Sequence, residues 1–201
     1  MSEAAGEAGL PSGLLRRDPA AFVDLIGLYQ ERLFNFALRY LGRREDAEEA
    51  VQDAFLKAHR DLYRRLPLER VQNLALTPWL YKIVLNTCRN HVRRRQLAAF
   101  DLREVEATLS ADGGSDPALA GERAALRRAL EDELRRLPPR YRAAVVLHLV
   151  EGLPYADVAT VLGLPVGTAK SHVHRGANLM RPALEPWWVA ECGKEGVEDG
   201  R

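Results

Sequence analysis

The stretch 152–181, GLPYADVATVLGLPVGTAKSHVHRGANLMR, carries side chains suited to binding a nucleic acid. An amphipathic segment, 155–162, ends at Gly163, and a second helical pattern starts near Thr168 after a tight connection; two such helices predict a helix-turn-helix. Apolar residues of the second helix share one face. Its other faces carry Thr168, Lys170, Ser171, His174, Arg175 and Asn178.

No Asp or Glu lies between Asp157 and Glu185, so the outer face of this second helix is free of acids. Such a face suits the major groove of a polyanion, which favours DNA binding. The alternative is an ordinary helical hairpin with a solvated basic face.

A second candidate surface lies on the helix predicted to open at Thr77 (as N-cap) and Pro78. From Arg70 to Phe100 there are six Lys and Arg residues and no acid. Guanidinium and amide groups along one helix face suit phosphates and base edges. That face carries Lys82, Asn86, Arg89, Asn90, Arg93, Arg94 and Arg95. Trp79 and Tyr81 could stack on unpaired bases, although Trp79 could equally belong to the core.

The preceding helix, which starts near Glu45, has an acidic outer face. The helix carries five acids, which are Glu45, Asp46, Glu48, Glu49 and Asp53. The neutral residue Gln52 lies on the same outer face. One interpretation is a solvated face that also favours the helix N-terminus. The other is a docking surface for a basic partner, and the pattern alone leaves both open.

The whole chain has the composition of a globular protein. It has 201 residues, 47% hydrophobic and 28% charged, with a net charge of +1. No apolar run approaches the ~20 residues of a membrane span, and the start lacks the basic and apolar regions of a signal peptide, so we expect a cytoplasmic location. The pattern of residues predicts no catalytic residue, metal site or cofactor. His172 and His174 are two residues apart and would point away from each other on a helix.

The elements that position these surfaces are all helical. Helix signals recur from Asp18-Pro19 to Gly42, from Glu45 to about residue 62, and from Thr77 onward, whereas 66–76 reads as a loop. A further helix is predicted at about 118–137. We therefore predict an all-α fold of two helical domains joined by a flexible linker. The parts are a disordered lead (1–17), a first domain (18–96), the linker (97–121), a helix-turn-helix domain (122–185) and a tail (186–201).

Three motifs in fixed order resemble a known family. They are DAEEAVQDAFLKAHR, then TPWLYKIVLNTCRNHVRRR, then LRRLPPRYRAAVVLHLVEGLPYADVATVLGLPVGTAKSHVHR. Together they are similar to bacterial RNA polymerase sigma factors of the short extracytoplasmic-function (ECF) subfamily. The resemblance covers about residues 18–96 and 122–184 and implies a subunit that directs promoter-specific initiation, including promoter melting.

The resemblance also implies a role for each surface. The acidic helix would dock on the clamp helices of the largest subunit of core RNA polymerase through Asp46, Glu49, Gln52 and Asp53. Promoter DNA would be melted at the minus-ten element by Trp79, Lys82, Asn86, Arg89, Asn90, Arg93 and Arg94. The loop 66–76 would hold a flipped base. Duplex DNA at the minus-thirty-five element would be read by Thr168, Lys170, Ser171, His172, His174 and Arg175.

The resemblance further implies other core surfaces and an anti-sigma factor as partners, and no membrane insertion. The chain departs from the family at His172, where Arg is frequent, and at Pro154, where a Ser or Thr cap is usual. Two rival hypotheses are a stand-alone helix-turn-helix regulator that binds duplex DNA as a dimer and a protein-binding adaptor without DNA affinity. The promoters, the inducing signal and the role of Trp187, Trp188 and Cys192 do not follow from the sequence.

Overall fold

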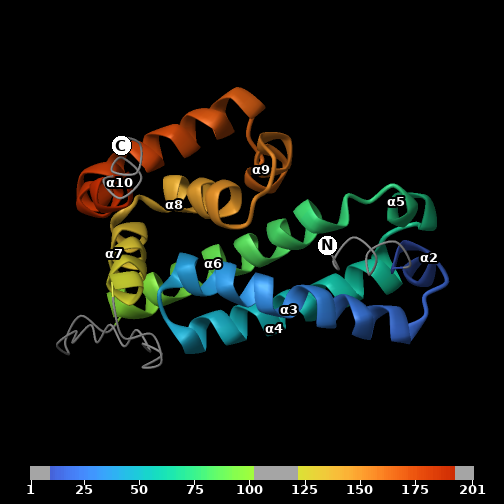
Figure 1. Ribbon diagram of the computed structural model, residues 1–201. Coiled ribbons are helices and arrows are strands. Elements are labelled where there is room, and N and C mark those ends of the chain that lie inside the picture. Colours follow the sequence, from blue (N-terminus) through green and yellow to red (C-terminus); the bar gives the residue numbers. More distant parts are fainter. Residues whose placement is uncertain (1–9, 102–121, 193–201) are drawn as a thin grey trace, which may run out of the picture.

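The computed structural model describes residues 10–101 and 122–192, and within these ranges every regular element is helical. The first domain contains α2 (Leu10–Leu15), α3 (Pro19–Leu41), α4 (Arg44–Arg60), the π-helical turn η1 (Asp61–Arg65), α5 (Leu68–Gln72) and α6 (Leu76–Asp101). The second contains α7 (Glu122–Arg136), α8 (Pro139–Val145), the π-helical turn η2 (Val146–Val150), α9 (Tyr155–Leu162) and α10 (Val166–Cys192). The all-α prediction with two helical parts is confirmed (Figure 1).

Local signals set the ends of α3 as predicted. The Asp18 carboxylate accepts a hydrogen bond from the Ala20 amide at 2.9 Å, and Pro19 occupies the first turn. At the other end Gly42 adopts a left-handed conformation with φ of 78°, which costs glycine nothing.

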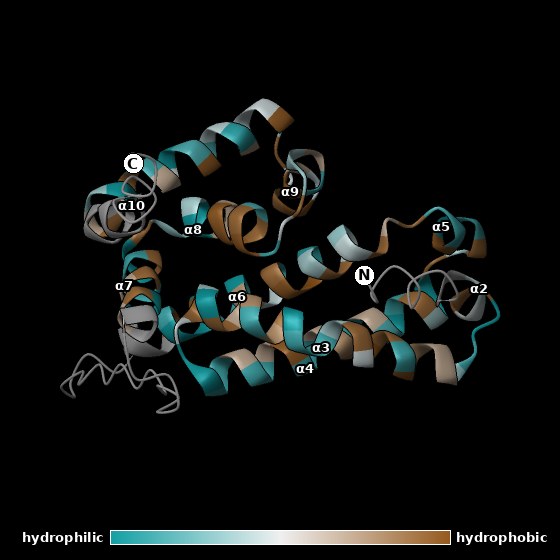
Figure 2. Ribbon diagram, viewed as in Figure 1, coloured by the Kyte–Doolittle hydropathy of each residue, from teal (hydrophilic) through white to brown (hydrophobic). Residues whose placement is uncertain are grey.

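The first domain is built on α3, α4 and α6, which pack against one another. Small side chains on α4 allow close approach, since Ala47, Ala50, Ala54 and Ala58 are all buried. Larger apolar side chains of α3 and α6 fill the space around them, and Figure 2 shows hydrophobic residues on the sides of these helices that face one another. Cys88 lies in this core, where burial raises the pKa of its thiol to about 12, so it behaves as an inert apolar group.

Three predictions for the first domain are wrong. Residues 10–17 are not a disordered lead, because α2 packs on α3 and α5 and buries Leu14; residues 1–9 lie outside the described ranges. The segment 66–76 is not simply a loop, since it contains α5. Thr77 is not an N-cap, because α6 begins one residue earlier and the Thr77 hydroxyl instead lies 2.6 Å from that of Tyr29.

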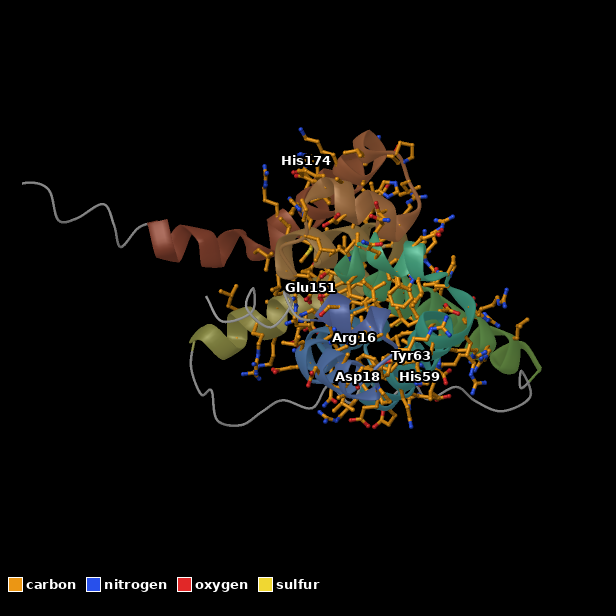
Figure 3. The ribbon with its side chains drawn as sticks, turned by 90° about the vertical axis from the view of Figure 1, so that its right-hand side faces the viewer. Arg16, Asp18, His59, Tyr63, Glu151 and His174 are labelled. Atoms are coloured by element: carbon orange, nitrogen blue, oxygen red, sulfur yellow. The ribbon has the colours of Figure 1, made fainter. Side chains whose placement is uncertain are left out.

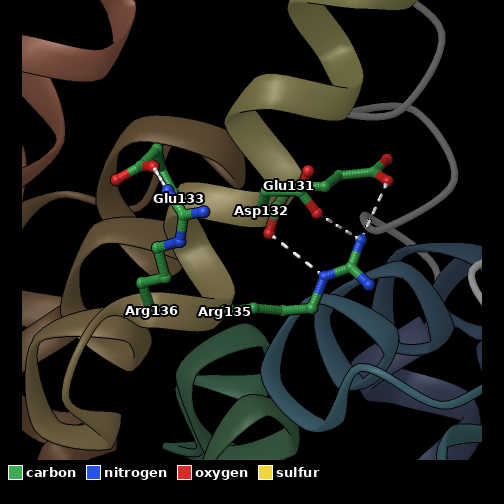
Figure 4. Close-up of polar contacts among 5 residues, drawn as sticks. All are labelled: Glu131, Asp132, Glu133, Arg135 and Arg136. Atoms are coloured by element: carbon green, nitrogen blue, oxygen red, sulfur yellow. Dashed lines mark hydrogen bonds and ion pairs between the residues drawn. The ribbon is translucent and has the colours of Figure 1, made fainter. Parts of the chain in front are cut away.

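The second domain packs α10 across α7, α8 and α9. Gly176 of α10 meets α8 so closely that an added Cβ would overlap the Val145 side chain. On α7, ion pairs one turn apart stabilise the outer face: Arg135 lies 3.2 Å from Asp132 and 3.9 Å from Glu131, and Arg136 pairs with Glu133 (Figure 4).

Two boundaries differ from those predicted for the second half of the chain. The tail predicted from residue 186 does not start as a separate segment there, since α10 continues to Cys192. Pro182 removes one backbone donor from the helix, but Asn178, whose carbonyl loses its partner, is exposed and accessible to water. The linker predicted at 97–121 begins later, because α6 extends to Asp101; residues 102–121, which include the predicted start of α7, lie outside the described ranges.

The two domains contact each other directly. Helix α6 packs against α9, and α3 packs against α7, α8 and η2. Figure 1 shows α8 to α10 gathered on one side of the α3–α6 layer. Among the described residues, no helix is both long and apolar enough to cross a membrane.

Candidate nucleic-acid interface

The helix-turn-helix of α9 and α10 has the geometry that the sequence predicted. Gly163 ends α9 in a left-handed conformation with φ of 68°, and Pro154 precedes the helix without a side-chain cap. Ala159 is buried where the two helices approach, and Ala169 and Val173 face the same core. Close apolar packing therefore fixes the direction of α10.

The opposite face of α10 is open to a ligand. Lys170, Ser171, His174 and Arg175 are exposed and Thr168 is half-buried. The Ser171 hydroxyl donates to the Gly167 carbonyl at 2.9 Å, which leaves its oxygen available as an acceptor. Figure 3 shows His174 on the outer surface, far from the labelled residues of the first domain.

His172 lies differently from the other five predicted duplex contacts. Its ring packs edge-on against Tyr141 with centroids 5.2 Å apart, and its Nδ1 is buried without a hydrogen-bond partner. Burial, followed by the nearby charges of Arg140 and Arg175, lowers the pKa of His172, so the ring is neutral at physiological pH. Arg140 also stacks over Tyr141, with its guanidinium carbon 4.7 Å from the ring centroid. His172 thus packs beside the two cations Arg140 and Arg175 and adds no charge of its own.

Most of the second predicted surface is exposed on α6. Lys82, Asn86, Arg89, Arg93 and Arg94 are exposed, whereas Trp79 and Asn90 are half-buried. The buried side of α6 also includes Tyr81, which the sequence suggested as a stacking residue. Its ring packs edge-on against Phe36 with centroids 5.4 Å apart, and the residue is 0% exposed, so it is not accessible to a base in this arrangement.

The four predicted docking residues of α4 divide between two faces. Glu49 and Gln52 are exposed. Asp46 and Asp53 face α6. Asp46 Oδ2 lies 2.5 Å from the Arg95 guanidinium, whereas Asp53 Oδ2 lies 3.7 Å from His91 Nε2, a buried nitrogen that makes no hydrogen bond.

Lys57 continues this line of polar contacts, because its Nζ donates to Thr87 Oγ1 at 3.0 Å. We call these three contacts the α4–α6 polar row. The row ties the acidic helix to the basic helix, and its members Arg95, His91, Lys57 and Thr87 were not assigned this role from the sequence. Only the distance of seven residues between Asp46 and Asp53, two helical turns, hinted that they share a face.

A groove between α3 and α4 lies beside the exposed acids. It has a volume of about 910 Å³ and apolar walls from Phe22, Ile26, Phe34, Val51, Phe55 and Leu56. The polar residues that complete its lining are Gln30, Glu31, Arg44, Glu48, Gln52 and His59. Leu56 is 60% exposed and adds an apolar side chain to the wall of the groove. The groove was not foreseen from the sequence.

Within the described residues no group of three or more His, Cys, Asp or Glu side chains could hold a metal ion. The surfaces are instead of three kinds: a basic face on α10, a basic face on α6, and an apolar groove with acids on α3 and α4. A helix-turn-helix joined to a second basic helix defines a DNA-binding protein.

Comparison with known proteins identifies the family. The model of sigma-70 region 2 matches residues 25–98, and that of sigma-70 region 4 matches residues 127–180. The chain is 34% identical to RNA polymerase sigma-H factor of Pseudomonas aeruginosa over 178 residues, which cover 85% of this chain and 90% of that protein. It is 28% identical to ECF RNA polymerase sigma factor SigW of Bacillus subtilis, covering 83% and 90%.

Solved structures agree with this result. Sigma factor RpoE of Bartonella quintana, solved with the anti-sigma factor NepR, superposes with a TM-score of 0.64 at 26% identity and covers 82% of this chain and 96% of that one. CnrH, solved with the cytosolic domain of CnrY, shares the fold with a TM-score of 0.62 at 22% identity, covering 88% and 96%. The chain belongs to the ECF sigma factors, and its function is promoter-specific initiation of transcription with core RNA polymerase.

Proposed function

We propose that this sigma factor uses its three surfaces in separate steps. The α3–α4 groove, with Glu49 and Gln52 beside it, binds the clamp helices of core polymerase. The outer face of α6 then melts the minus-ten element and holds the separated strand, while α10 reads the minus-thirty-five element as duplex. The chain acts by binding and strand separation, in the cytoplasm with polymerase, and performs no enzymatic chemistry.

The observation that carries this proposal is the arrangement of α4 and α6. The α4–α6 polar row helps to orient the exposed basic face of α6 relative to the docking face of α4. A polymerase bound to α4 therefore presents α6 to DNA in one fixed direction. Basic and amide side chains such as Arg89 and Asn86 can bind phosphates and base edges once the strands separate.

The four predicted docking residues of α4 are proposed to have two different roles. Glu49 and Gln52 contact polymerase, whereas Asp46 and Asp53 position α6 through Arg95 and His91. An anti-sigma factor is a further proposed partner. The solved complex of the Bartonella sigma factor with NepR supports it by similarity.

The test is reconstitution with core polymerase and a library of promoters. We expect stable co-purification with core and initiation from one class of promoter. Lysine at both Glu49 and Gln52 is expected to weaken core binding at least tenfold, whereas Asp132→Lys, at an exposed acid of α7, serves as the control for added charge. Core binding unchanged by the α4 substitutions would contradict the docking assignment.

A further inference from the structure

A buried carboxylate joins the two domains. The Tyr81 hydroxyl of α6 donates a hydrogen bond of 2.6 Å to Oε2 of Glu151, the residue that follows η2. The Arg39 guanidinium of α3 lies 3.7 Å from the other carboxylate oxygen, and only 7% of the Glu151 side chain is exposed. A buried carboxylate is costly unless it is paired. Here both partners come from the opposite domain, so the contact depends on the domains being closed.

The surroundings of Tyr81 strengthen this contact. Its ring is fixed edge-on against Phe36. Burial and the adjacent Glu151 carboxylate raise the pKa of Tyr81, so the phenol keeps its proton and remains a donor. We call Arg39, Tyr81 and Glu151 the interdomain cluster; Figure 3 shows Glu151 between His174 of the second domain and the labelled residues of the first.

A second contact closes the other end of the interface. Arg142 of α8 donates from one guanidinium nitrogen to the Tyr40 carbonyl at the end of α3, at 2.7 Å. From the other it donates to the carbonyls of Arg135 and of Leu137, the latter at 3.1 Å. The α7–α8 connection is thereby held against the end of α3.

The closed arrangement conflicts with the spacing of the two promoter elements. By their names they lie about 25 base pairs apart, which is about 85 Å of duplex at ~3.4 Å per base pair. In the structure α6 packs on α9 and α9 packs on α10. Helices are about 10–12 Å in diameter, so α10 lies within about two helix diameters of α6. A chain closed in this way cannot bind both elements of one promoter.

We propose that the interdomain cluster holds the free sigma factor in a closed, promoter-incompetent form, and that opening separates Glu151 from Tyr81 and Arg39. The inference rests on the proposed function only for the use of two separated promoter elements. The docking groove on α3 and α4 remains exposed when the domains are closed, so polymerase can bind the closed chain first and then hold the domains apart. Loss of the cluster makes the open form easier to reach.

The test is a distance between spin labels on Val23→Cys of α3 and Thr160→Cys of α9, both exposed positions. The protein used for labelling also carries Cys192→Ser, so that this thiol does not react with the spin-label reagent. Cys88 is buried and therefore inaccessible to the reagent. We expect one short distance in the otherwise unchanged protein. Glu151→Lys, which places a cation beside Arg39, is expected to raise the open-to-closed ratio at least tenfold. Glu45→Lys makes the same change at an exposed acid of α4 and is expected to leave the distance unchanged.

Further variants keep every outcome informative. Glu151→Gln retains an acceptor for Tyr81 and is expected to open the domains less than Glu151→Lys. If circular dichroism shows that the lysine variant is unfolded, Arg39→Gln tests the same contact from the first domain. A long distance in the unchanged protein, or a short one in every folded variant, overturns the proposal.

A polymerase titration separates this inference from the proposed function. Glu151→Lys is expected to bind core polymerase at lower concentration than the unchanged chain, because less free energy is used to open it. A chain that opens as expected but binds no polymerase would contradict the proposed function and leave domain closure supported. A chain that binds polymerase but has unaltered label distances in all variants would contradict the role of the interdomain cluster and leave the proposed function supported.

Discussion

The two helices proposed to meet DNA are held in place by partly different contacts. Both pack through apolar side chains, and α6 buries Leu80, Val84 and Leu85. Helix α6 also makes polar contacts with α4, from Asp46–Arg95 at one end to Lys57–Thr87 at the other. Helix α10 is oriented by close apolar packing, with Gly176 against Val145 and Val173 in the core. We therefore expect changes of charge to affect the direction of α6 more than that of α10, whereas changes of volume should affect both helices.

Substituting Gly176 by Val is expected to have the largest effect. The new side chain would overlap Val145, and overpacking of this kind costs up to ~3 kcal/mol of unfolding free energy. Urea unfolding of the protein measures it. Gly167→Ala is the control, because a Cβ there meets nothing within 4 Å, and it is expected to be neutral or to stabilise by up to ~1 kcal/mol. Equal destabilisation by both would show that close packing does not orient α10.

Replacing Arg175 by Ala tests whether the exposed face of α10 reads duplex sequence. A base contact from this guanidinium would be worth ~1–3 kcal/mol of discrimination. We expect a matching loss of preference for an intact minus-thirty-five element in transcription by the reconstituted enzyme. Arg181→Ala, at an exposed position one and a half turns further along α10, is the control. A preference that survives Arg175→Ala would remove this residue from the readout.

A double-mutant cycle on Asp46 and Arg95 tests the α4–α6 polar row. The pair is close but partly exposed, so solvent screening limits the expected coupling to ~0.5–1 kcal/mol in urea unfolding. The Asp46→Asn variant should also impair promoter melting while core binding is retained. A loss of core binding without a change in melting would return Asp46 to the docking surface.

The smallest expected effect concerns pH and His172. Its lowered pKa means that the folded protein binds fewer protons than the unfolded chain near pH 6.5. The neutral ring therefore contributes stability that is fully present above that pH and is lost as pH falls below it. His172→Gln is expected to flatten this part of the stability profile, measured by thermal unfolding from pH 8 to 5.5. An unaltered profile would contradict the buried position of the ring.

Much of the fold followed from local signals in the sequence. Asp18, Pro19 and Gly42 set the ends of α3, and Gly163 ended α9, because caps depend on residues only a few positions apart. Thr77 had a similar signal, yet its hydroxyl pairs with Tyr29, which lies 48 residues earlier. Tertiary contacts of this kind override a local preference and cannot be seen in a pattern of neighbours.

The surfaces divided in the same way. The exposed faces of α6 and α10 could be predicted because an acid-free helix face is visible in the sequence. The separation of Asp46 and Asp53 from Glu49 and Gln52 could not, since it depends on where α6 packs against α4. His172 was assigned to DNA by its position in a motif, but the ring is held by Tyr141, 31 positions earlier in the chain. Glu151 had no pattern of its own and became notable only through Tyr81 and Arg39.

The most direct measurement uses a promoter that carries 2-aminopurine in the minus-ten element, whose fluorescence rises when the strands separate. Polymerase is reconstituted with one of three sigma factors. These are the unchanged chain, an α6 variant with Asn86→Ala and Arg89→Ala, and an α10 variant with Arg175→Ala. We expect the α6 variant to bind the promoter with its minus-thirty-five preference intact and to lose the fluorescence rise. The α10 variant is expected to lose that preference yet melt the DNA it binds. Normal melting by the α6 variant, or loss of melting only in the α10 variant, would contradict the proposed roles of the two helices.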